Sequence, residues 1–513
     1  MNKRSSILLA DTATTQNVAV IPFLDPVDKT LRVGSTVTGL SGILTHSFGV
    51  HAIHPTTSAP PVFAYAPRPL TPPAVGGAIK VASFNVLNFF NGDGAGGGFP
   101  TSRGASTVAE FNRQKAKTVA ALCGLGADVV GLMEMENDAT TTAPALNELT
   151  AALNASSGCG AWSFVANPAG WGTFPGSTDE IRPALIYRNT VVATVGAAMS
   201  PNDAAFVQAR APVAQTFSVI SGASTGAKLS VIVNHFKSKG GTATGADIDQ
   251  NDGQGPFNAT RKTQATALLS FITAVQTAAN DPDVLIIGDL NSYSEEDPID
   301  ILRAGGLVKL DSDGYSYVFD AQTGSLDHAL ATPSLVAQIT NTGVWHINAD
   351  EPIILDYNVE FKNTPGCTAS CTSPDYYAPT PFRSSDHDPV LVGMALNAPT
   401  LDVDDSAPTT PYDAASDGLL LMRYLLGFRD DALINGAISP AARRNATAIS
   451  AHIAANLSRF DVDGDGQTLA LTDGVMILRR LLGITNSAAI TQGVKNSSRS
   501  DADVVFTIDA LKP

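Results

Sequence analysis

The sequence predicts a chain organised around an α/β domain, because short apolar runs alternate with helical patterns through its middle. The clearest run covers residues 284–287. It lies between Asp283 and Gly288 and is typical of a fully buried strand. Amide, carboxylate or imidazole side chains end many of these runs. In α/β proteins ligands bind where strand ends and loops converge, so we expect a functional site at one sheet edge.

The elements expected in this domain begin at residue 79. Strands are predicted at the apolar runs, whose ranges are 80–85, 128–134, 182–187, 229–235, 284–287, 325–330 and 390–396. Helices are predicted at 107–122, 144–154 and 259–279. Thr107 and Glu110 have the spacing of a capping box, which is why the first helix is expected to begin there.

Composition divides the chain into four predicted regions. Residues 1–57 alternate β-branched or apolar residues with glycine turns, and we interpret them as the C-terminal part of a small β domain. Residues 58–78 contain six prolines and predict a stiff linker, because proline fixes φ and cannot donate to a strand ladder. Residues 79–397 form the α/β domain. Residues 398–513 contain no glutamate and carry an internal repeat.

The repeat pairs residues 417–427 with residues 473–483, which share an Asp-Gly start and a Leu-Leu-Gly end. Alternating carboxylates closed by a glycine turn precede the second copy and predict a structural Ca²⁺ loop. Its expected ligands are Asp461, Asp463, Asp465 and Asp473. Before the first copy, an insertion with two prolines separates Asp402 and Asp404 from Asp413, so we interpret that loop as degenerate. The helix faces expected to pack together are Leu419, Met422 and Leu426, and Val475, Leu478 and Leu482.

The cysteines and the N-terminus bear on the compartment. None of the cysteines has the neighbours of a zinc finger, and two disulfides in an oxidising compartment are favoured for Cys123, Cys159, Cys367 and Cys371. Four buried thiols in a reducing cytosol are the alternative. Residues 7–10 are too short for the core of a signal peptide. We therefore expect the natural start and its signal peptide to lie upstream, and the protein to be secreted or held at the cell surface.

The formal net charge is -16 and the isoelectric point about 4.8, so the protein is strongly acidic. A uniformly basic surface for nucleic acid is thereby excluded. A polyanionic substrate must instead meet a local basic patch or bound metal ions. No apolar run approaches transmembrane length, and no membrane partner is expected.

The polar residues at the strand ends suggest a chemistry. They are Asn85, Glu134, His235, Asp289, Asn291, Asp327, Asp386 and His387. Oxygen ligands without thiolates suit Mg²⁺, Mn²⁺ or Ca²⁺ rather than structural zinc. The sequence has neither a glycine-rich phosphate loop with a lysine nor a serine elbow of hydrolase type. The set suits metal-assisted attack of water on a phosphoester.

These residues lie in motifs that resemble the endonuclease/exonuclease/phosphatase superfamily, and the motifs occur in that family's order. They are Ser83-Phe-Asn85-Val-Leu-Asn, Leu132-Met-Glu134, Asn234-His235-Phe, Gly288-Asp289-Leu-Asn291-Ser, Leu326-Asp327-His and Ser385-Asp386-His387-Asp-Pro. Longer phrases at 234–240 and 249–261 resemble the bacterial extracellular nuclease branch. The resemblance implies a four-layer α/β/β/α sandwich. The tail resembles a dockerin-like pair of calcium-loop-and-helix repeats.

The resemblance also implies roles for single residues. Glu134 would hold Mg²⁺ or Mn²⁺ with Asn85 and Asp386 close by. Asp289 and Asn291 would orient the attacking water or the transition state. His387 would pair with Asp327, which fixes its tautomer, and His235 would sit across the scissile phosphate. Phosphate contacts would come from Arg182, with Lys237, Lys239 and Arg261 as weaker candidates.

The sequence therefore predicts a secreted, metal-dependent nuclease that hydrolyses phosphodiesters of DNA, with RNA as a second substrate. A phosphatase or phospholipase-type phosphodiesterase is the first alternative, because substrate choice lies in loops rather than in the fold. A non-catalytic, calcium-dependent surface module is the second. The sequence leaves endo- against exonuclease action open. We expect a monomer, and the tail to dock either a cohesin-like partner or its own chain.

Overall fold

The structure is a computed structural model of the whole chain. It describes all residues except 1–5, 12, 14, 48, 57, 59, 139–143, 223, 311–313, 369, 397–399, 407–411 and 513. The chain forms two compact units. The first comprises Met1–Phe217, Leu229–Gln276 and Asp283–Ala395, and the second comprises Ser218–Lys228, Thr277–Pro282 and Leu396–Pro513. The boundaries predicted at residues 57 and 397 fall outside the described residues. No described helix is long and apolar enough to cross a membrane.

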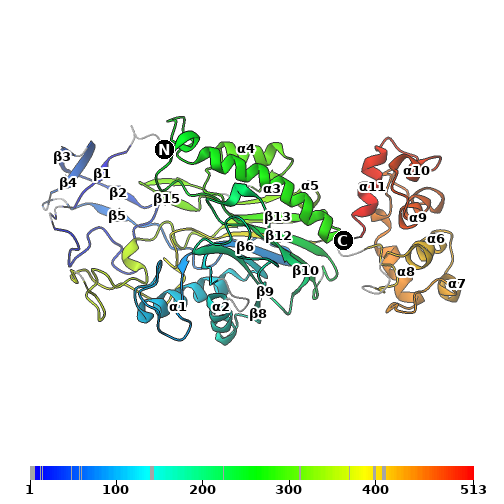
Figure 1. Ribbon diagram of the computed structural model, residues 1–513, viewed down its shortest axis with the longest axis horizontal. Coiled ribbons are helices and arrows are strands. Elements are labelled where there is room, and N and C mark those ends of the chain that lie inside the picture. Colours follow the sequence, from blue (N-terminus) through cyan, green and yellow to red (C-terminus); the bar gives the residue numbers. More distant parts are fainter. Residues whose placement is uncertain are drawn as a thin grey trace. The chain divides into compact units, whose positions relative to one another are not determined.

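Two six-stranded sheets form the centre of the first unit, and they confirm the mixed α/β class (Figure 1). The first sheet has the order β18 (Ile339–Val344), β19 (Val390–Met394), β6 (Ile79–Phe89), β7 (Val129–Glu136), β9 (Ile181–Arg188) and β8 (Trp162–Phe164). The second has the order β10 (Val192–Met199), β11 (Val213–Val219), β12 (Lys228–His235), β13 (Val284–Asp289), β17 (Asp327–Ala331) and β14 (Val308–Lys309). The central pairs β6–β7 and β12–β13 are parallel, and β19 and β17 run antiparallel to them.

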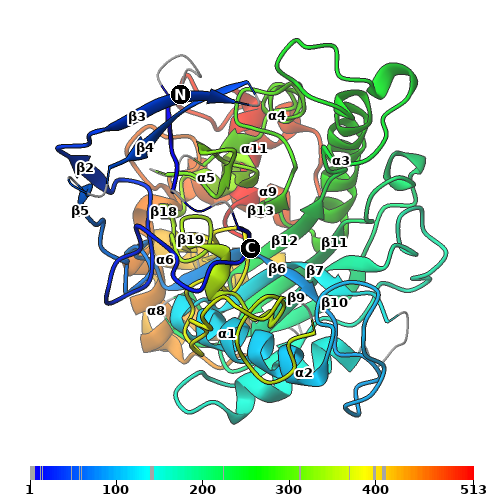
Figure 2. The same ribbon diagram turned by 90° about the vertical axis from the view of Figure 1, so that its left-hand side faces the viewer.

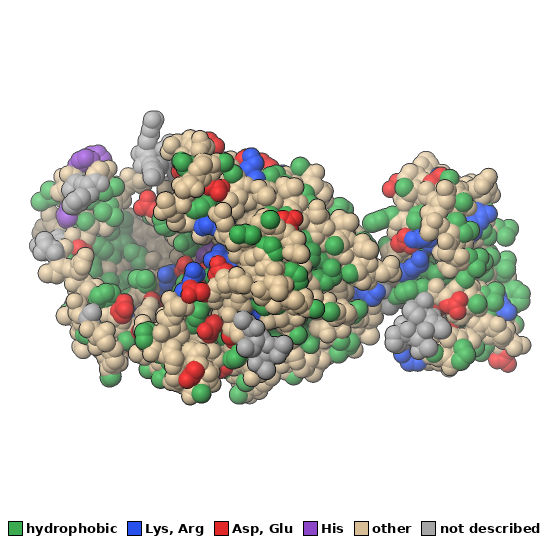
Figure 3. All heavy atoms as spheres, in the orientation of Figure 1, with side chains coloured by type: hydrophobic (Ala, Val, Ile, Leu, Met, Phe, Trp, Pro, Cys, Tyr) green, Lys and Arg blue, Asp and Glu red, His purple; other side chains and the backbone are tan. Residues whose placement is uncertain are grey.

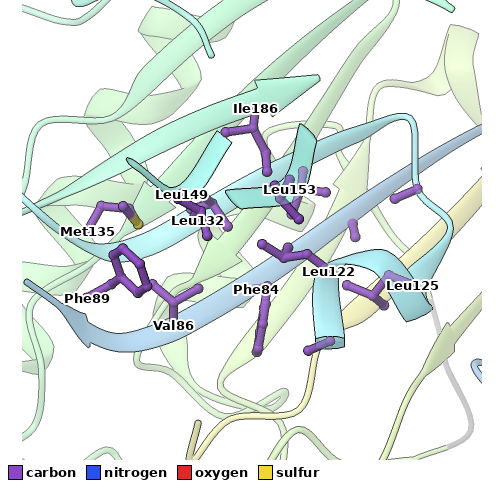
Figure 4. Close-up of a cluster of buried hydrophobic side chains, with 14 of the residues drawn as sticks. Phe84, Val86, Phe89, Leu122, Leu125, Leu132, Met135, Leu149, Leu153 and Ile186 are labelled. Atoms are coloured by element: carbon purple, nitrogen blue, oxygen red, sulfur yellow. The ribbon is translucent and has the colours of Figure 1, made fainter. Parts of the chain in front are cut away.

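Helices α1 (Val108–Leu125) and α2 (Pro144–Ala155) pack on the first sheet. Figure 4 shows the aromatic and aliphatic side chains of β6 and β7 meeting leucines of both helices. The capping box forms: Glu110 N–H donates to Thr107 Oγ1 at 3.1 Å, and Ser106 N–H donates to Glu110 Oε2 at 2.7 Å. A disulfide joins Cys123 on α1 to Cys159 before β8, and a second joins Cys367 to Cys371.

Helices α3 (Asn258–Ala279) and α4 (Asp297–Ala304) cover the second sheet through a separate apolar core. Figure 2 shows α1 and α2 on one side of the strands and α3 on the other. The two sheets meet closely at Gly131 on β7, where a Cβ would lie 2.7 Å from both Ile287 and Val233. Apolar side chains on the inner faces thus bring the ends of β6, β7, β12 and β13 together.

The N-terminal segment forms two small sheets beside these layers. One has the order β1 (Leu8–Leu9), β4 (Val50–Pro55), β3 (Gly42–Ser47), and the other pairs β2 (Thr36–Thr38) with β5 (Val62–Ala64). Two arginines attach this segment to the α/β layers. Arg68 pairs with Glu351 at 2.7 Å, and Arg32 pairs with Glu351 and with Asp350 at 3.1 Å.

The second unit has its own apolar core. Its helices are α6 (Leu419–Leu425), α7 (Asp430–Ile434), α8 (Ala446–Ala455), α9 (Val475–Leu481), α10 (Ser487–Thr491) and α11 (Asp501–Asp509). The two repeats pack reciprocally: Gly418 faces Leu478 and Leu481, and Gly474 faces Met422 and Leu425. The predicted helix faces are only partly right. The deepest residues are Leu420, Leu421, Met476 and Ile477, whereas Leu426 and Leu482 are exposed.

Candidate active site

One edge of the second sheet gathers three of the predicted catalytic residues. His235 ends β12 and Asp289 ends β13, and their parallel register places the two residues side by side. Because β17 runs antiparallel to β13, its first residue, Asp327, lies opposite Asp289. His235 Nε2 is 3.5 Å from Asp289 Oδ2. The ends of these strands form one wall of a buried polar site.

The first sheet supplies the facing wall. Asn85 lies on β6 and Glu134 on the neighbouring strand β7, whereas Asp386 and His387 precede β19. Asn85 Nδ2 is 3.3 Å from Glu134 Oε1 and 3.5 Å from Asp289 Oδ2, so this amide connects the two sheets. The eight polar residues singled out at the strand ends therefore lie at a single site.

Unusual backbone conformations aim several of these groups. Glu134 has a φ of 64° at an irregularity in the β7–β9 register, and such a bulge redirects a side chain. Gly288 has a φ of 136°, and a Cβ there would lie 2.0 Å from Asn234 O. Only glycine therefore allows β12 and β13 to approach this closely before Asp289. Asn291 has a φ of 48°, and its N–H donates to Asp289 Oδ1 at 2.8 Å.

His387 is held among carboxylates. Its Nδ1 lies 2.7 Å from Asp327 Oδ2, and its Nε2 lies 3.9 Å from Asp289 Oδ2. Burial by itself lowers the pKa of His387, but the charges of Asp327, Asp386 and Asp289 outweigh it and raise the pKa well above the usual value. The ring of Tyr317 lies 4.6 Å from the His387 ring. His387 is therefore cationic and fixed in orientation.

His235, on the other side of Asp289, is neutral rather than cationic. Complete burial lowers its pKa well below the usual value, and the positive charge of Arg210 lowers it further. Its Nδ1 is buried and has no hydrogen-bond partner among the described residues. Burial also raises the pKa of Asp289 to about 7. One carboxylate thus stands between a neutral and a cationic imidazole, an arrangement suited to handling a proton near neutral pH.

A divalent cation fits beside Glu134. Burial raises the pKa of Glu134, and the negative charge of Asp386 raises it further. A cation between Glu134 and Asp386 would stabilise both carboxylates in their charged form and so offset the effects of burial and of their mutual repulsion. Carboxylate and amide oxygens are suitable Mg²⁺ ligands. Asp289, Asp327 and His387 also offer ligand atoms within 4.8 Å of one another. We favour the first group, because a cationic His387 bound to Asp327 has no free lone pair for a metal.

Two groups at the site were not predicted from the sequence. Arg210 is buried in the loop three residues before β11, its Nε lies 3.7 Å from Asp179, and the charges of Glu134 and Asp289 act on it. In the sequence it stands in an Arg-Ala-Pro step before a strand, and nothing in that step indicates a functional role. The backbone N–H of Asn88 donates to Glu134 Oε2 at 3.0 Å, and backbone donors leave no trace in a sequence.

The predicted phosphate-binding residues separate into different roles. The phosphate contact predicted for Arg261 is wrong. Its side chain has no exposed surface and donates to Gln254 O, Pro256 O and Lys237 O, so it stabilises the loop before α3. Lys239 is paired with Glu296 at 2.7 Å. Lys237 is half-buried, 3.9 Å above the Phe257 ring, close enough for its charge to act on His235.

Arg182 lies on β9 opposite Met135, and Met135 directly follows Glu134 in the sequence. Its guanidinium is buried, donates to Asn167 and lies 5.5 Å from the Trp171 ring. Burial lowers the pKa of Arg182 to about 10. The side chain is thus committed to the loop around Asn167, and its contact with a phosphate stays a prediction.

The second unit contains two groups of carboxylates. Asp461, Asp463 and Asp473 offer ligand atoms within 4.8 Å of one another, whereas Asp465 Oδ2 accepts from Asn496 Nδ2 at 2.9 Å. The first loop differs from our interpretation as degenerate. Asp402, Asp404 and Asp417 form an equally close group, and Asp417 is the counterpart of Asp473 in the repeat. Asp404 and Asp417 thus lie close together although the insertion separates them in the sequence.

Comparison with known proteins identifies the family. A profile of the Endonuclease/Exonuclease/phosphatase family matches residues 82–387. No curated protein matches the chain. Among solved structures, sphingomyelinase C from Streptomyces griseocarneus is 18% identical, with 62% of this chain and 99% of that chain covered and a TM-score of 0.39. A mannosyl-6-phosphatase from Bacteroides thetaiotaomicron is 15% identical, with 62% and 100% covered and a TM-score of 0.37.

A further protein from Bacteroides thetaiotaomicron, described as a member of the same family, is 14% identical, with 61% and 93% covered and a TM-score of 0.38. The family match spans more than half of the 513 residues and includes every strand-end residue from Asn85 to His387. The chain therefore belongs to the Endonuclease/Exonuclease/phosphatase family, whose members are hydrolases of phosphate esters.

Proposed function

We propose that the protein is a metal-dependent nuclease that hydrolyses phosphodiester bonds of DNA. The observation that carries the proposal is the position of Asp289. Its Oδ2 lies 3.5 Å from Asn85 Nδ2, 3.5 Å from His235 Nε2 and 3.9 Å from His387 Nε2. Asp289 thus brings a base together with a cation and hydrogen-bond donors, the groups that hydrolysis of a phosphodiester needs.

The residues have distinct roles in the proposed reaction. Asp289 accepts a proton from the attacking water, and Asn291 fixes the Asp289 carboxylate through its N–H. As water bonds to phosphorus, the bond between phosphorus and the leaving oxygen breaks. Cationic His387 donates a hydrogen bond to the phosphoryl oxygen, where negative charge accumulates. Mg²⁺ or Mn²⁺, held by Glu134, Asp386 and Asn85, would neutralise phosphate charge when bound.

A nucleic acid is favoured over a single phosphate group by positive charge at the site. Arg210 and half-buried Lys237 both lie close enough for their charges to act on His235. Lys237 Nζ donates to carbonyl and hydroxyl oxygens of 238–240, and the charges of Asp247 and Asp179 also act on it. Such local cations can bind a polyanion on an otherwise acidic protein.

We also infer the finer architecture and the location of the protein. The two sheets and their helices correspond to a four-layer α/β/β/α sandwich, and residues 398–513 to dockerin-like repeats that bind Ca²⁺ through Asp461, Asp463 and Asp473. Two disulfides support an oxidising, extracellular location. The reciprocal packing of the two repeats supports an intramolecular role for their apolar faces, with a cohesin-like partner as the other outcome.

Incubation with linear and closed circular DNA tests the proposal. The purified chain should cut DNA with Mg²⁺ or Mn²⁺, and both a chelator and Asp289→Ala should abolish cutting. Cutting of the circular form would establish endonuclease action, and cutting of the linear form alone exonuclease action. Hydrolysis of p-nitrophenyl phosphate without cutting of either DNA would replace the proposal with a phosphatase.

A further inference from the structure

Arg103 lies in the loop between β6 and α1, next to the backbone that contacts the metal-site carboxylate. Gly104 packs against Asn88: a Cβ on Gly104 would lie 2.3 Å from Asn88 O. Asn88 N–H in turn donates to Glu134 Oε2 at 3.0 Å. The backbone of Asn88 therefore lies between the loop that carries Arg103 and the Glu134 carboxylate, and contacts both.

The side chain of Arg103 forms an ion pair and still remains exposed to solvent. Its Nε lies 3.0 Å from Glu180 Oε2, and 40% of the Arg103 side chain and 56% of the Glu180 side chain are exposed. The backbone of Glu180 is fixed, because its carbonyl accepts from Asn137 N–H at 2.9 Å immediately before β9 begins. The bridge engages Nε and orients the guanidinium, and the exposed surface leaves room for an anion.

Arg103 and Arg210 belong to the same wall of the site. Neighbouring residues hold them: Asp179 lies beside Arg210 at 3.7 Å, and Glu180 beside Arg103 at 3.0 Å. Arg210 is buried close to Glu134 and Asp289, whereas Arg103 lies further out. The charge of Arg103 still acts on both Arg210 and His235. Figure 3 shows Lys and Arg side chains gathered with Asp and Glu side chains at the edge of a hollow on one face.

We propose that Arg103 binds a phosphate that flanks the scissile phosphate of a polynucleotide, and so selects polymers over substrates with one phosphate group. The inference rests on the proposed nuclease function and specifies its substrate class. An inner arginine beside the reacting groups and an outer, exposed arginine would meet different phosphates of the same strand. A substrate with a single phosphate at Asp289 has no group to place at Arg103.

Arg103→Gln in the full chain tests this assignment. Plasmid DNA is compared with bis(p-nitrophenyl) phosphate, a diester with one phosphate group. We expect kcat/KM for DNA to fall at least tenfold at low salt and kcat/KM for the small diester to stay within twofold. The slope of log(kcat/KM) for DNA against log[salt] should become shallower by about 0.9, the loss of one phosphate contact. Arg103→Lys keeps the charge and should retain most of that slope.

Arg303→Gln is the matched control, because Arg303 on α4 is 52% exposed and is likewise paired with a carboxylate, Asp300, at 3.4 Å. It should leave the DNA rate and salt slope unchanged. Equal losses on DNA and on the small diester would overturn the inference and assign Arg103 a structural role. Unchanged DNA cleavage would also overturn it while leaving the nuclease function intact. If the unmodified chain does not cut DNA, both proposals fall together.

Discussion

Replacing Asp327 with asparagine tests the histidine–carboxylate pair most directly. The two side chains have nearly the same shape, so an asparagine fits the same buried position between Ser316 and His387. The change removes the negative charge 2.7 Å from His387 Nδ1. Without that charge His387 loses the strongest of the effects that keep it cationic. We expect Asp327→Asn to fold normally and to hydrolyse phosphodiesters slowly.

The size of the loss follows from the buried contact. A hydrogen bond to a charged group contributes about 1.5–3 kcal/mol, which corresponds to about 10- to 150-fold in rate. If the whole contribution of His387 to the transition state disappears, the loss reaches about 10⁴-fold. Asp327 is buried and has no contact with substrate in the proposed reaction, so kcat should carry the loss and KM should change little.

The assay compares kcat and KM of Asp327→Asn and the unmodified chain on bis(p-nitrophenyl) phosphate and on DNA. Asp320→Asn is the control, because Asp320 is an exposed carboxylate in the turn between β15 (Tyr317–Phe319) and β16 (Gln322–Gly324). Its φ of 49° is one that asparagine tolerates. Thermal unfolding of both variants establishes that the fold is intact. A folded Asp327→Asn with kcat within threefold of the unmodified chain would refute the role given to the pair.

Three further predictions concern the metal site, a buried lysine and the second unit. Glu134→Gln should lower Mg²⁺-dependent hydrolysis at least a hundredfold and weaken Mn²⁺ binding measured by calorimetry; unchanged Mn²⁺ affinity would remove Glu134 from the metal site. Burial lowers the pKa of Lys117 to about 7, so the unfolded chain binds a proton that the native chain lacks up to pH 10.5. The free energy of unfolding should therefore gain about 1.4 kcal/mol per pH unit from this lysine above pH 7, and Lys117→Met should lack that gain in urea titrations. Ca²⁺ should raise the melting temperature of the unmodified chain, and Asp473→Ala should reduce the increase; an equal increase in both would exclude the second loop as a Ca²⁺ site.

The strand-end residues could be predicted because strand pairing constrains them strongly. His235 and Asp289 end two apolar runs, and parallel pairing places such ends at one sheet edge. Asp327 begins an antiparallel strand, so it reaches the same edge from the opposite direction. Once the apolar runs are recognised as strands, few arrangements keep these carboxylates and imidazoles apart.

The cations could not be predicted in the same way. Arg261 and Arg210 are both single arginines near turns, yet Arg261 ends inside the loop before α3 and Arg210 ends beside Glu134 and Asp289. Which carbonyls and carboxylates an arginine meets depends on how distant loops pack, and a local pattern carries no information on that. The first acidic loop shows the same limit, since Asp402 and Asp404 lie beside Asp417 although an insertion separates them from it in the sequence.

The acidic charge of the whole chain does not oppose a polyanionic substrate at this site. At physiological ionic strength, exposed charges are screened beyond about 8 Å, so most of the formal charge of -16 acts weakly on a phosphate bound at Asp289. The charges that matter are Arg103, Arg210 and Lys237, all close enough to act on His235. Arg103 and Arg210 each pair with a neighbouring carboxylate, which fixes the side chain in position and neutralises part of its charge. A small set of fixed cations would make the proposed binding local and salt-dependent on a protein whose net charge is negative.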